Sequence, residues 1–432
     1  MATPTTPGST SIPVSETVQQ RAAKPPTGRR TLRALANPNY RLYFFGQFGS
    51  QTGAWLQRTA QAWLVLVDLR GSPADLGLLT ALQFAPIMVL TLFAGVIADR
   101  FSKRRLMFVI QTVSTVQAVA MAALTLSGVV QLWHVYVLAF ILGVVSAFDF
   151  PTRQSFVGEL VSREELQSAI GLNSSVFNGA RILGPGFGGV VIAAWGTGWC
   201  FALNAVSFLA VLVSLALLDT RSLHEVRRPP RAALWTQLAD GLRYAARQPR
   251  LSFAIGVLAF IGTFGYNFGV VLPLLATQAL GLDSVGFGSL NTAMGVGALI
   301  AALGVVARLT PTDAKVLVAG GLFSVLLLVA AFVAWPVVLL VLVLLGVANV
   351  TYSAMTNTTL QLNSDEEYRG RVLSLYTLLF AGTTPIGGAL TGWLADRWGI
   401  RDALAIEAGV CILAVVLGAA YLRVRHADGA TT

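Results

Sequence analysis

Long hydrophobic runs without a charged residue alternate with short polar segments along the chain. No Asp, Glu, Lys or Arg occurs in 182–218, 251–282 or 316–364. A helix needs about 20 apolar residues to cross a bilayer, so the last run holds two spans, joined by a turn at Trp335-Pro336. Helices satisfy their own backbone groups in lipid, and the pattern therefore predicts an all-α membrane protein.

Twelve transmembrane helices are predicted in this way, and they leave little room for a soluble domain. Their approximate limits are 41–67, 74–98, 105–127, 132–150, 167–194, 199–219, 251–279, 284–307, 315–334, 337–357, 371–394 and 402–422. The composition agrees, because 55% of the 432 residues are hydrophobic and only 12% are charged, against about 25% charged in a typical soluble domain.

The basic residues fall on one side of the predicted membrane. With the N-terminus inside, all but five of the 30 Lys and Arg residues lie in internal loops and ends. The exceptions are Arg70, Arg397 and Arg401 in outer loops, and Arg58 and Arg181 inside spans. This asymmetry follows the positive-inside rule and places both termini in the cytoplasm, with the protein in the cytoplasmic membrane. The net charge of +10 is thereby explained, and no nucleic-acid partner is expected.

The two halves of the chain repeat each other. Residues 162–170 parallel 364–372, and 184–188 parallel 384–388, which indicates a parallel duplication of six spans. Transporters built this way bind substrate between the halves, near the bilayer midplane. The predicted organisation is a disordered cytoplasmic tail (1–39), a six-helix half (40–219), a basic cytoplasmic linker (220–250), a second six-helix half (251–422) and a cytoplasmic tail (423–432). Within the linker, Trp235, Leu238, Leu242 and Ala245 predict a connecting helix on the membrane surface.

The loop between the second and third spans carries a recognisable pattern. Its residues Gly95, Asp99, Arg100, Lys103 and Arg104 resemble the loop signature of the major facilitator superfamily of transporters, with Ser102 in place of the usual Gly. The resemblance implies a conformational gate that holds the outward-open state and breaks when the cytoplasmic side opens. The alternative is a basic loop that only sets topology. A similar run, Gly392 to Arg397, is expected in an external loop and is read as a coincidence.

The fifth span carries a second pattern. Gly184, Pro185, Gly188 and Gly189 resemble the Gly-Pro-x-x-Gly-Gly signature of exporters in that superfamily, although Ala180 stands where the family has an earlier Gly. Proline frees a backbone carbonyl and glycines allow close helix packing, so ordinary small-residue packing is the alternative.

A wider resemblance covers the chain from Tyr40 to Arg425. Residues 49–63, 148–153 and 178–185 are similar to the branch that contains enterobactin, effector and macrolide exporters. The resemblance implies secondary active export of small hydrophobic or anionic molecules by alternating access. Siderophores, macrolides or other drugs would be the substrates, and protons the coupling ion. We expect a monomer without a cofactor.

Polar side chains inside the spans mark the expected substrate cavity. Gln47, Gln51, Arg58 and Gln61 share one helix face, as do Asn178 and Arg181. Intramembrane charges usually face a cavity, although a structural Arg bonded to helix carbonyls is the alternative. Two cations without a matching carboxylate suggest an anionic or electron-rich substrate. The second half adds aromatic and amide candidates: Phe264, Tyr266, Asn267, Asn291, Asn349, Tyr352 and Tyr376.

Acidic and metal-binding candidates are few. Asp149 is the candidate for proton coupling, with helix capping as its alternative, and Glu407 falls in the twelfth span, which is peripheral in this fold. Cys200 and Cys411 lack metal-ligand spacing, so no metal site is expected. No His-Glu-x-x-His or P-loop motif occurs, which disfavours a polytopic membrane enzyme. An importer or a lipid flippase of the same fold remains the alternative function.

Overall fold

The computed structural model describes residues 32–224, 234–306 and 309–429, and every regular element in these ranges is helical. The first half of the chain forms η1 (Arg33–Ala36), α2 (Pro38–Trp63), η2 (Leu64–Asp68), α3 (Pro73–Arg100), α4 (Lys103–Leu126), α5 (Leu132–Leu160), α6 (Leu166–Trp195), α7 (Thr197–Leu217) and η3 (Thr220–Ser222). The second half forms α8 (Leu234–Arg247), α9 (Pro249–Phe260), η4 (Ile261–Gly265), α10 (Phe268–Leu274), η5 (Leu275–Ala279), α11 (Ser284–Ile300), η6 (Ala301–Val305), α12 (Asp313–Phe332), α13 (Val337–Leu362), α14 (Glu366–Ala381), α15 (Thr384–Trp398) and α16 (Ile400–Gly429).

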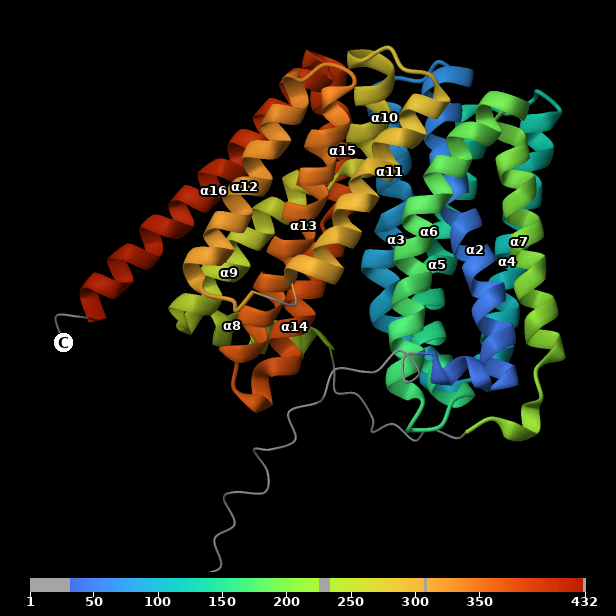
Figure 1. Cartoon of the computed structure of the whole chain (residues 1–432), viewed down its shortest axis with the longest axis horizontal. Helices are drawn as coiled ribbons and strands as arrows, with labels where there is room; N and C mark the ends of the chain where they lie inside the picture. The colour runs from blue at the N-terminus through green and yellow to red at the C-terminus, as the bar shows by residue number, and fades with distance from the viewer. Residues whose placement is uncertain (1–31, 225–233, 307–308, 430–432) are drawn as a thin grey trace, which may run out of the picture.

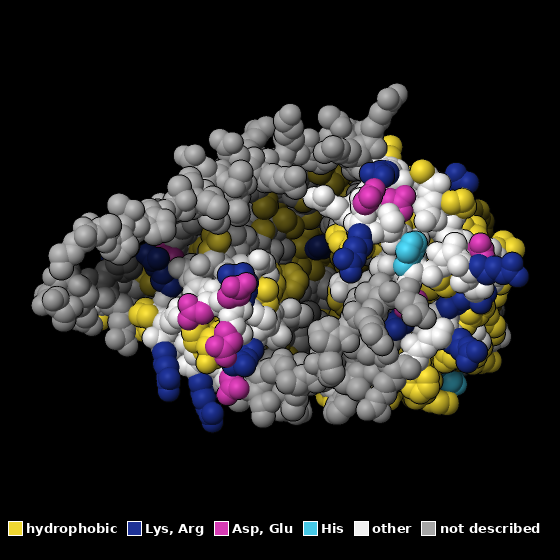
Figure 2. Space-filling model, turned by 90° about the horizontal axis from the view of Figure 1, so that it is seen from below, with side chains coloured by type: hydrophobic (Ala, Val, Ile, Leu, Met, Phe, Trp, Pro, Cys, Tyr) yellow, Lys and Arg dark blue, Asp and Glu magenta, His cyan; other side chains and the backbone are white. Residues whose placement is uncertain are grey.

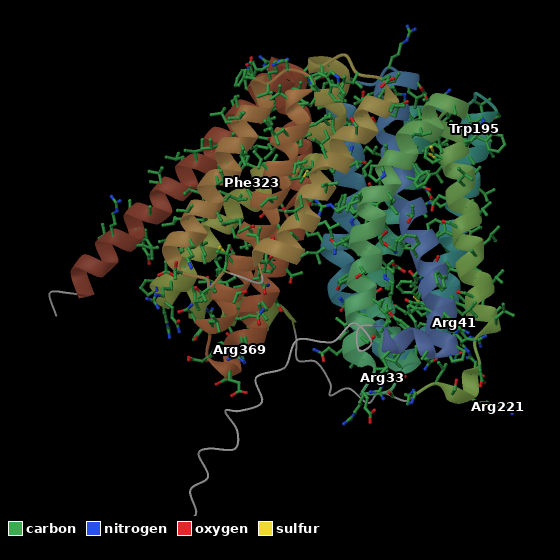
Figure 3. All side chains as sticks on the ribbon, in the orientation of Figure 1. Arg33, Arg41, Trp195, Arg221, Phe323 and Arg369 are labelled. Carbon is green, nitrogen blue, oxygen red and sulfur yellow. The ribbon has the colours of Figure 1, made fainter. Side chains whose placement is uncertain are left out.

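The helices stand in two bundles side by side, α2–α7 in one and α9–α16 in the other (Figure 1). We call these bundles the first and second halves. Trp195 marks one end of the molecule, here the upper end, whereas Arg33, Arg41, Arg221 and Arg369 mark the opposite, lower end (Figure 3). The two halves meet through α6 against α11 and through α3 against α15.

The predicted all-α architecture of twelve membrane helices is confirmed. Eleven segments of the described chain are long and apolar enough to cross a membrane. The twelfth is α2, which packs between α6 and α7 and carries more polar side chains, including Gln47, Gln57 and Gln61. These amides are buried inside the protein rather than exposed to lipid, and their polarity lowers the hydropathy of α2.

Three spans differ in detail from their predicted form. The seventh is broken at Tyr266 and Asn267, where the Asn267 amide donates to the Thr263 carbonyl at 2.8 Å. The eleventh is divided between α14 and α15, and the Thr383 hydroxyl donates to the Leu379 carbonyl at 2.9 Å there. In both breaks a side chain satisfies a carbonyl that the interrupted helix leaves free. The fourth span continues to Leu160, ten residues beyond its predicted end.

The placement of Gly392 in an external loop was wrong, because α15 continues to Trp398 and holds this glycine in its interior. A Cβ on Gly392 would lie 2.6 Å from the Pro73 carbonyl oxygen and 2.7 Å from the Gly77 Cα. Only a glycine allows α15 to approach α3 this closely.

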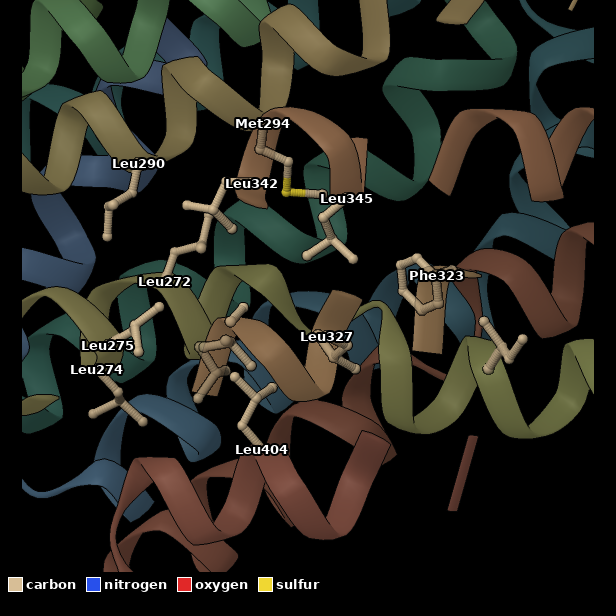
Figure 4. Close-up of a cluster of buried hydrophobic side chains, with 14 of the residues drawn as sticks. Leu272, Leu274, Leu275, Leu290, Met294, Phe323, Leu327, Leu342, Leu345 and Leu404 are labelled. Carbon is tan, nitrogen blue, oxygen red and sulfur yellow. The ribbon is translucent and has the colours of Figure 1, made fainter. Parts of the chain in front are cut away.

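The core of the second half is packed by large aliphatic side chains around one phenyl ring. Leu272, Met294, Phe323 and Leu342 come from four different helices and are all buried (Figure 4). Close packing of this kind holds the helices of the second half in fixed positions against one another.

Two segments at the lower end tie the chain termini and linker to the halves. The last part of the expected N-terminal tail forms η1, where the Arg33 guanidinium lies 2.9 Å from the Glu164 carboxylate. In the linker, the helix predicted from its apolar spacing is α8, and the Tyr244 ring stacks on Tyr368 at 4.2 Å. Most of the expected tail (1–31) and the linker residues 225–233 lie outside the described residues.

Candidate functional site

A cavity of about 330 Å³ lies between the two halves and is lined by both. Seen from below, the molecule is hollowed between the halves, and hydrophobic side chains wall the hollow (Figure 2). A larger hollow of about 750 Å³ lies around Arg250 and Arg423, but the second half alone lines it. The shared cavity is therefore the candidate substrate site, because its walls come from both halves and could contact one ligand together.

Seven of the thirteen predicted cavity candidates line this site. They are Arg58 and Gln61 on α2, Arg181 on α6, Tyr266 and Asn267 at the break of the seventh span, Asn291 on α11 and Asn349 on α13. They come from helices far apart in the sequence, and the fold brings them to one space.

The other six predicted residues, Phe264 and Tyr376 among them, do not line the cavity. The Gln47 side chain is buried and accepts a long hydrogen bond of 3.5 Å from Arg153. The Asn178 amide donates to the Ser174 carbonyl of its own helix at 2.8 Å. Tyr352 is fully buried against Gly320, and Gln51 is half-buried outside the lining.

The Arg58 guanidinium lies against aromatic rings instead of an acid. Its central carbon lies 4.9 Å from the Trp55 ring centroid and 5.8 Å from that of Phe84. Among the described residues, neither Arg58 nor Arg181 has a carboxylate within ion-pair distance. The cavity thus carries positive charge that the described protein leaves uncompensated, which favours a negatively charged or electron-rich ligand.

Several buried polar atoms around the cavity lack a hydrogen-bond partner among the described residues. They are both amide atoms of Gln61, the Tyr266 hydroxyl and the Asn267 side-chain oxygen. Leaving such groups unpaired costs about 1–3 kcal/mol each, so they favour a ligand or water that supplies the missing bonds.

The cavity wall also contains residues that the sequence reasoning missed. Trp55, Phe84 and Phe177 supply aromatic surface, and Thr80 and Gln83 supply polar atoms from α3. The polar pair, three residues apart in an otherwise apolar span, was a signal that could have identified α3 as a lining helix.

The glycines of the exporter-type motif divide between two neighbours. Gly184 and Gly188 face α2 in their own half, where a Cβ on Gly184 would lie 2.5 Å from that of Trp55. Gly189 faces the second half, and a Cβ there would overlap the Ser284 carbonyl oxygen. The Ser284 hydroxyl donates to the Gly189 carbonyl at 3.0 Å.

Pro185 completes this crossing. Its carbonyl oxygen would lie 2.7 Å from a Cβ on Gly288 of α11. The motif therefore closes the two halves against each other toward the upper end of the cavity.

The repeat copy of this motif makes the equivalent crossing from the other side. Gly388 of α15 packs on Thr80, and Gly77 of α3 would place a Cβ 2.8 Å from the Gly388 carbonyl oxygen. Each half therefore contributes one small-residue helix that seals the upper end.

The predicted gate loop lies at the lower end of the molecule, and the structure describes the side chains of only part of it. The backbone of Gly95, Asp99 and Arg100 belongs to α3, but their side chains are not among the described residues. The Lys103 ammonium lies 3.5 Å from the Glu159 carboxylate, and Arg104 donates to the Leu215 carbonyl at 3.0 Å. These described contacts stay within the first half.

Asp149 lies in the interior of α5, eleven residues before its end. Its carboxylate pairs with Arg153 one turn along the helix, at 3.2 Å, and both side chains are largely buried. This position does not match the alternative of helix capping.

The sequence of the described bundle matches one family over nearly its whole length. The family described as transmembrane secretion effector matches residues 30–432. The chain belongs to the transmembrane secretion effector family. The resemblance to major facilitator exporters is confirmed, and this family member is a multi-pass transporter of the cytoplasmic membrane rather than an enzyme.

Two relatives of this family member have described transport roles. The multidrug efflux pump Tap of Mycolicibacterium fortuitum is 28% identical over 404 residues, covering 90% of this chain and 96% of Tap. The staphyloferrin A transporter of Staphylococcus aureus is 26% identical over 388 residues, covering 86% and 94% of the two chains.

Solved structures share the fold at lower identity. An inward-facing bacterial homologue of the lysosomal transporter Spinster has a TM-score of 0.68 at 14% identity, covering 89% of this chain and 96% of that one. A peptide transporter of the POT family has a TM-score of 0.70 at 13% identity, covering 90% and 94%.

Proposed function

We propose that this chain is a secondary active exporter of small hydrophobic or anionic molecules, driven by protons and working by alternating access. The observation that carries the proposal is the cavity shared by both halves, with Arg58 and Arg181 uncompensated among aromatic side chains. Siderophores fit this chemistry as electron-rich anions, and macrolides or other drugs fit its apolar walls. The names of the efflux and staphyloferrin A relatives support export of such compounds.

The direction of opening supports alternating access. The glycine crossings at Gly189 and Gly388 close the upper end, while the hollow opens on the lower face, where Lys and Arg side chains gather (Figure 2). Under the positive-inside rule the lower face is cytoplasmic, with both termini on that side, so this state accepts substrate from the cytoplasm.

The gate loop and the motif glycines take complementary roles in this scheme. Gly95, Asp99, Arg100, Lys103 and Arg104 would join the halves at the lower end in the outward-open state. In the exporter-type motif, Pro185 and Gly189 would join and separate the upper ends, while Gly184 and Gly188 would hold α6 against α2. We propose that the protein works as a monomer, since each chain provides both halves of one cavity.

The test is substrate accumulation in inverted membrane vesicles that contain this chain, with and without an imposed proton gradient. The panel holds catecholate siderophores, macrolides, and lipophilic anions and cations matched in size. Gradient-dependent uptake with a preference for anions is expected. Equal transport of anions and cations would contradict the assigned role of the two arginines.

One variant is a control for transport itself, and two other results would indicate the alternative functions. Vesicles with a Gly189→Leu variant should show no uptake, because the branched side chain collides with the backbone at Ser284. Uptake only into right-side-out vesicles would instead indicate an importer, and movement of a labelled phospholipid between leaflets would indicate a flippase.

A further inference from the structure

A second buried carboxyl group lies in the half that has no cavity cation. Glu407 is fully buried, two turns into α16, and roughly 10 Å from the upper end of that helix at 1.5 Å per residue. One carboxyl oxygen forms a short hydrogen bond with the Thr391 hydroxyl of α15. The other oxygen has no partner among the described residues.

The surroundings of Glu407 contain no described cation that could pair with a carboxylate. The nearby titratable groups are the Cys411 thiol on the same helix and, beyond it, the Tyr266, Tyr352 and Tyr376 phenols. Arg401 is bound to the Ala279 and Ala331 carbonyls at 3.1 and 3.0 Å.

Charged residues on the other helices packed against α16 stand at helix ends. They are Arg250 on α9, Asp313 and Lys315 on α12, and Asp396 and Arg397 on α15. A buried carboxylate without a cation is costly, so the neutral acid suits this site.

The hydrogen bonds around Thr391 also suit the neutral acid. The Thr391 hydroxyl has one hydrogen, and it donates to the Gly387 carbonyl at 2.9 Å. The short contact to Glu407 then needs a hydrogen from the carboxyl group. A protonated Glu407 that donates to Thr391 satisfies both contacts.

One helix connects this carboxyl group to the cavity and to the closed upper end. Thr391 lies on α15 between Gly388 and Gly392, the two glycines that cross to α3. On another side of α15, a Cβ on Gly387 would lie 2.5 Å from the Asn267 side-chain oxygen, and Asn267 lines the cavity.

We propose that Glu407 is the residue that carries the coupling proton, and that α15 transmits its protonation state to the upper seal and the cavity. This inference rests on the proposed proton-driven export. The neutral acid belongs to the state closed at the upper end. When the proton leaves toward the lower side, which is open in this state, the carboxylate requires water, which favours separation of α15 from α16 and opening of the α15–α3 crossing. The proton returns from the upper side, and the substrate leaves on that side.

The experiment uses full-length protein in proteoliposomes, with the best substrate of the vesicle panel. Two rates are measured: transport driven by a proton gradient, and exchange of labelled for unlabelled substrate without a gradient. For Glu407→Gln, both rates should be lost, because the side chain cannot release a proton and stays neutral, which favours the state closed at the upper end. Binding of the substrate to the purified variant, measured by calorimetry, should be retained, since Gln keeps the size and hydrogen bonding. Asp402→Asn, an exposed acid on the same helix, is the matched control and should change neither rate.

Gradient-driven transport by Glu407→Gln at the wild-type rate would overturn the assignment. If that variant does not fold, Glu407→Asp replaces it, and a shifted pH profile of transport is expected. An unchanged pH profile for that variant would likewise overturn the assignment. A wild-type protein that exchanges substrate but ignores the gradient would overturn proton-driven export itself, which is a distinguishable result.

Discussion

In the first half, the Asp149 carboxylate lies 3.2 Å from the Arg153 guanidinium, one turn along the same helix. In the second half, Glu407 is buried beside a threonine, with no described cation near it. The first acid has a cation within ion-pair distance, whereas a buried acid without a cation, like the second, favours its neutral form. The comparison teaches that the groups around a buried acid, and not its depth alone, decide whether it is suited to carry a proton.

The largest expected effect comes from breaking the ion pair of the first half. Asp149→Ala leaves Arg153 buried without its partner, and we expect the free energy of unfolding to fall by about 3–5 kcal/mol. Thermal unfolding in detergent measures the change. The free energy of unfolding should fall much less for Glu407→Gln, because this change leaves no buried charge unpaired. The comparison fails if both variants lose equal stability, or if the double variant Asp149→Asn with Arg153→Gln recovers none of it.

The next effect concerns the two glycine crossings, one supplied by each half. An alanine at Gly189 meets a fixed backbone carbonyl, whereas an alanine at Gly388 meets the Thr80 methyl group, which can shift. We expect Gly189→Ala to disfavour the state closed at the upper end by about 1–3 kcal/mol, and Gly388→Ala by less.

Spin labels at Trp133→Cys and Trp398→Cys, exposed positions on opposite halves, report the separation of the upper ends. Equal distances for both alanine variants would show that the two crossings are energetically equivalent.

A smaller effect tests the charge of the cavity, which comes from the first half. Arg58→Gln removes the cation that stacks on Trp55, and we expect affinity for an anionic substrate to fall about tenfold, or 1.4 kcal/mol. Binding to the purified protein, measured by calorimetry, gives the value. Arg70→Gln, outside the cavity, is the control, and an equal loss for cationic compounds would argue against charge recognition.

The smallest effect returns to the second half. Thr391→Val removes the hydroxyl between Glu407 and the Gly387 carbonyl, and we expect a loss of stability of about 1 kcal/mol, typical of one hydrogen bond. Thermal unfolding checks it against Thr125→Val, whose hydroxyl bonds only its own helix at the Met121 carbonyl. A larger loss for the control would show that the Glu407 contact adds no stability.

Much of the fold could be predicted because charge-free runs report directly on lipid exposure. The breaks at Asn267 and Thr383 could not, since single amide and hydroxyl groups compensate them locally and leave hydropathy unchanged. The role of Gly392 could not be predicted either, because it depends on the close approach of α15 to α3 and not on the neighbouring residues in the sequence.

The candidate site was predicted in part for a similar reason. Helix periodicity identified the face of α2 that carries Gln47, Arg58 and Gln61, but not how far along it the cavity extends. Gln47 shares the face yet lies beside Arg153, about three turns from Arg58. Aromatic residues such as Phe84 could not be assigned to the cavity from the sequence, because an aromatic side chain in a membrane span can equally well face lipid.

The linker is held at both of its ends. The His224 amide donates to the Glu159 carbonyl of the first half at 2.8 Å, and Tyr244 of α8 stacks on Tyr368 of the second half. Between His224 and Leu234 the chain can reach at most about 35 Å, even fully extended. The length of the linker therefore limits how far the lower ends of the two halves can separate, and with it the size of a molecule that can enter between them.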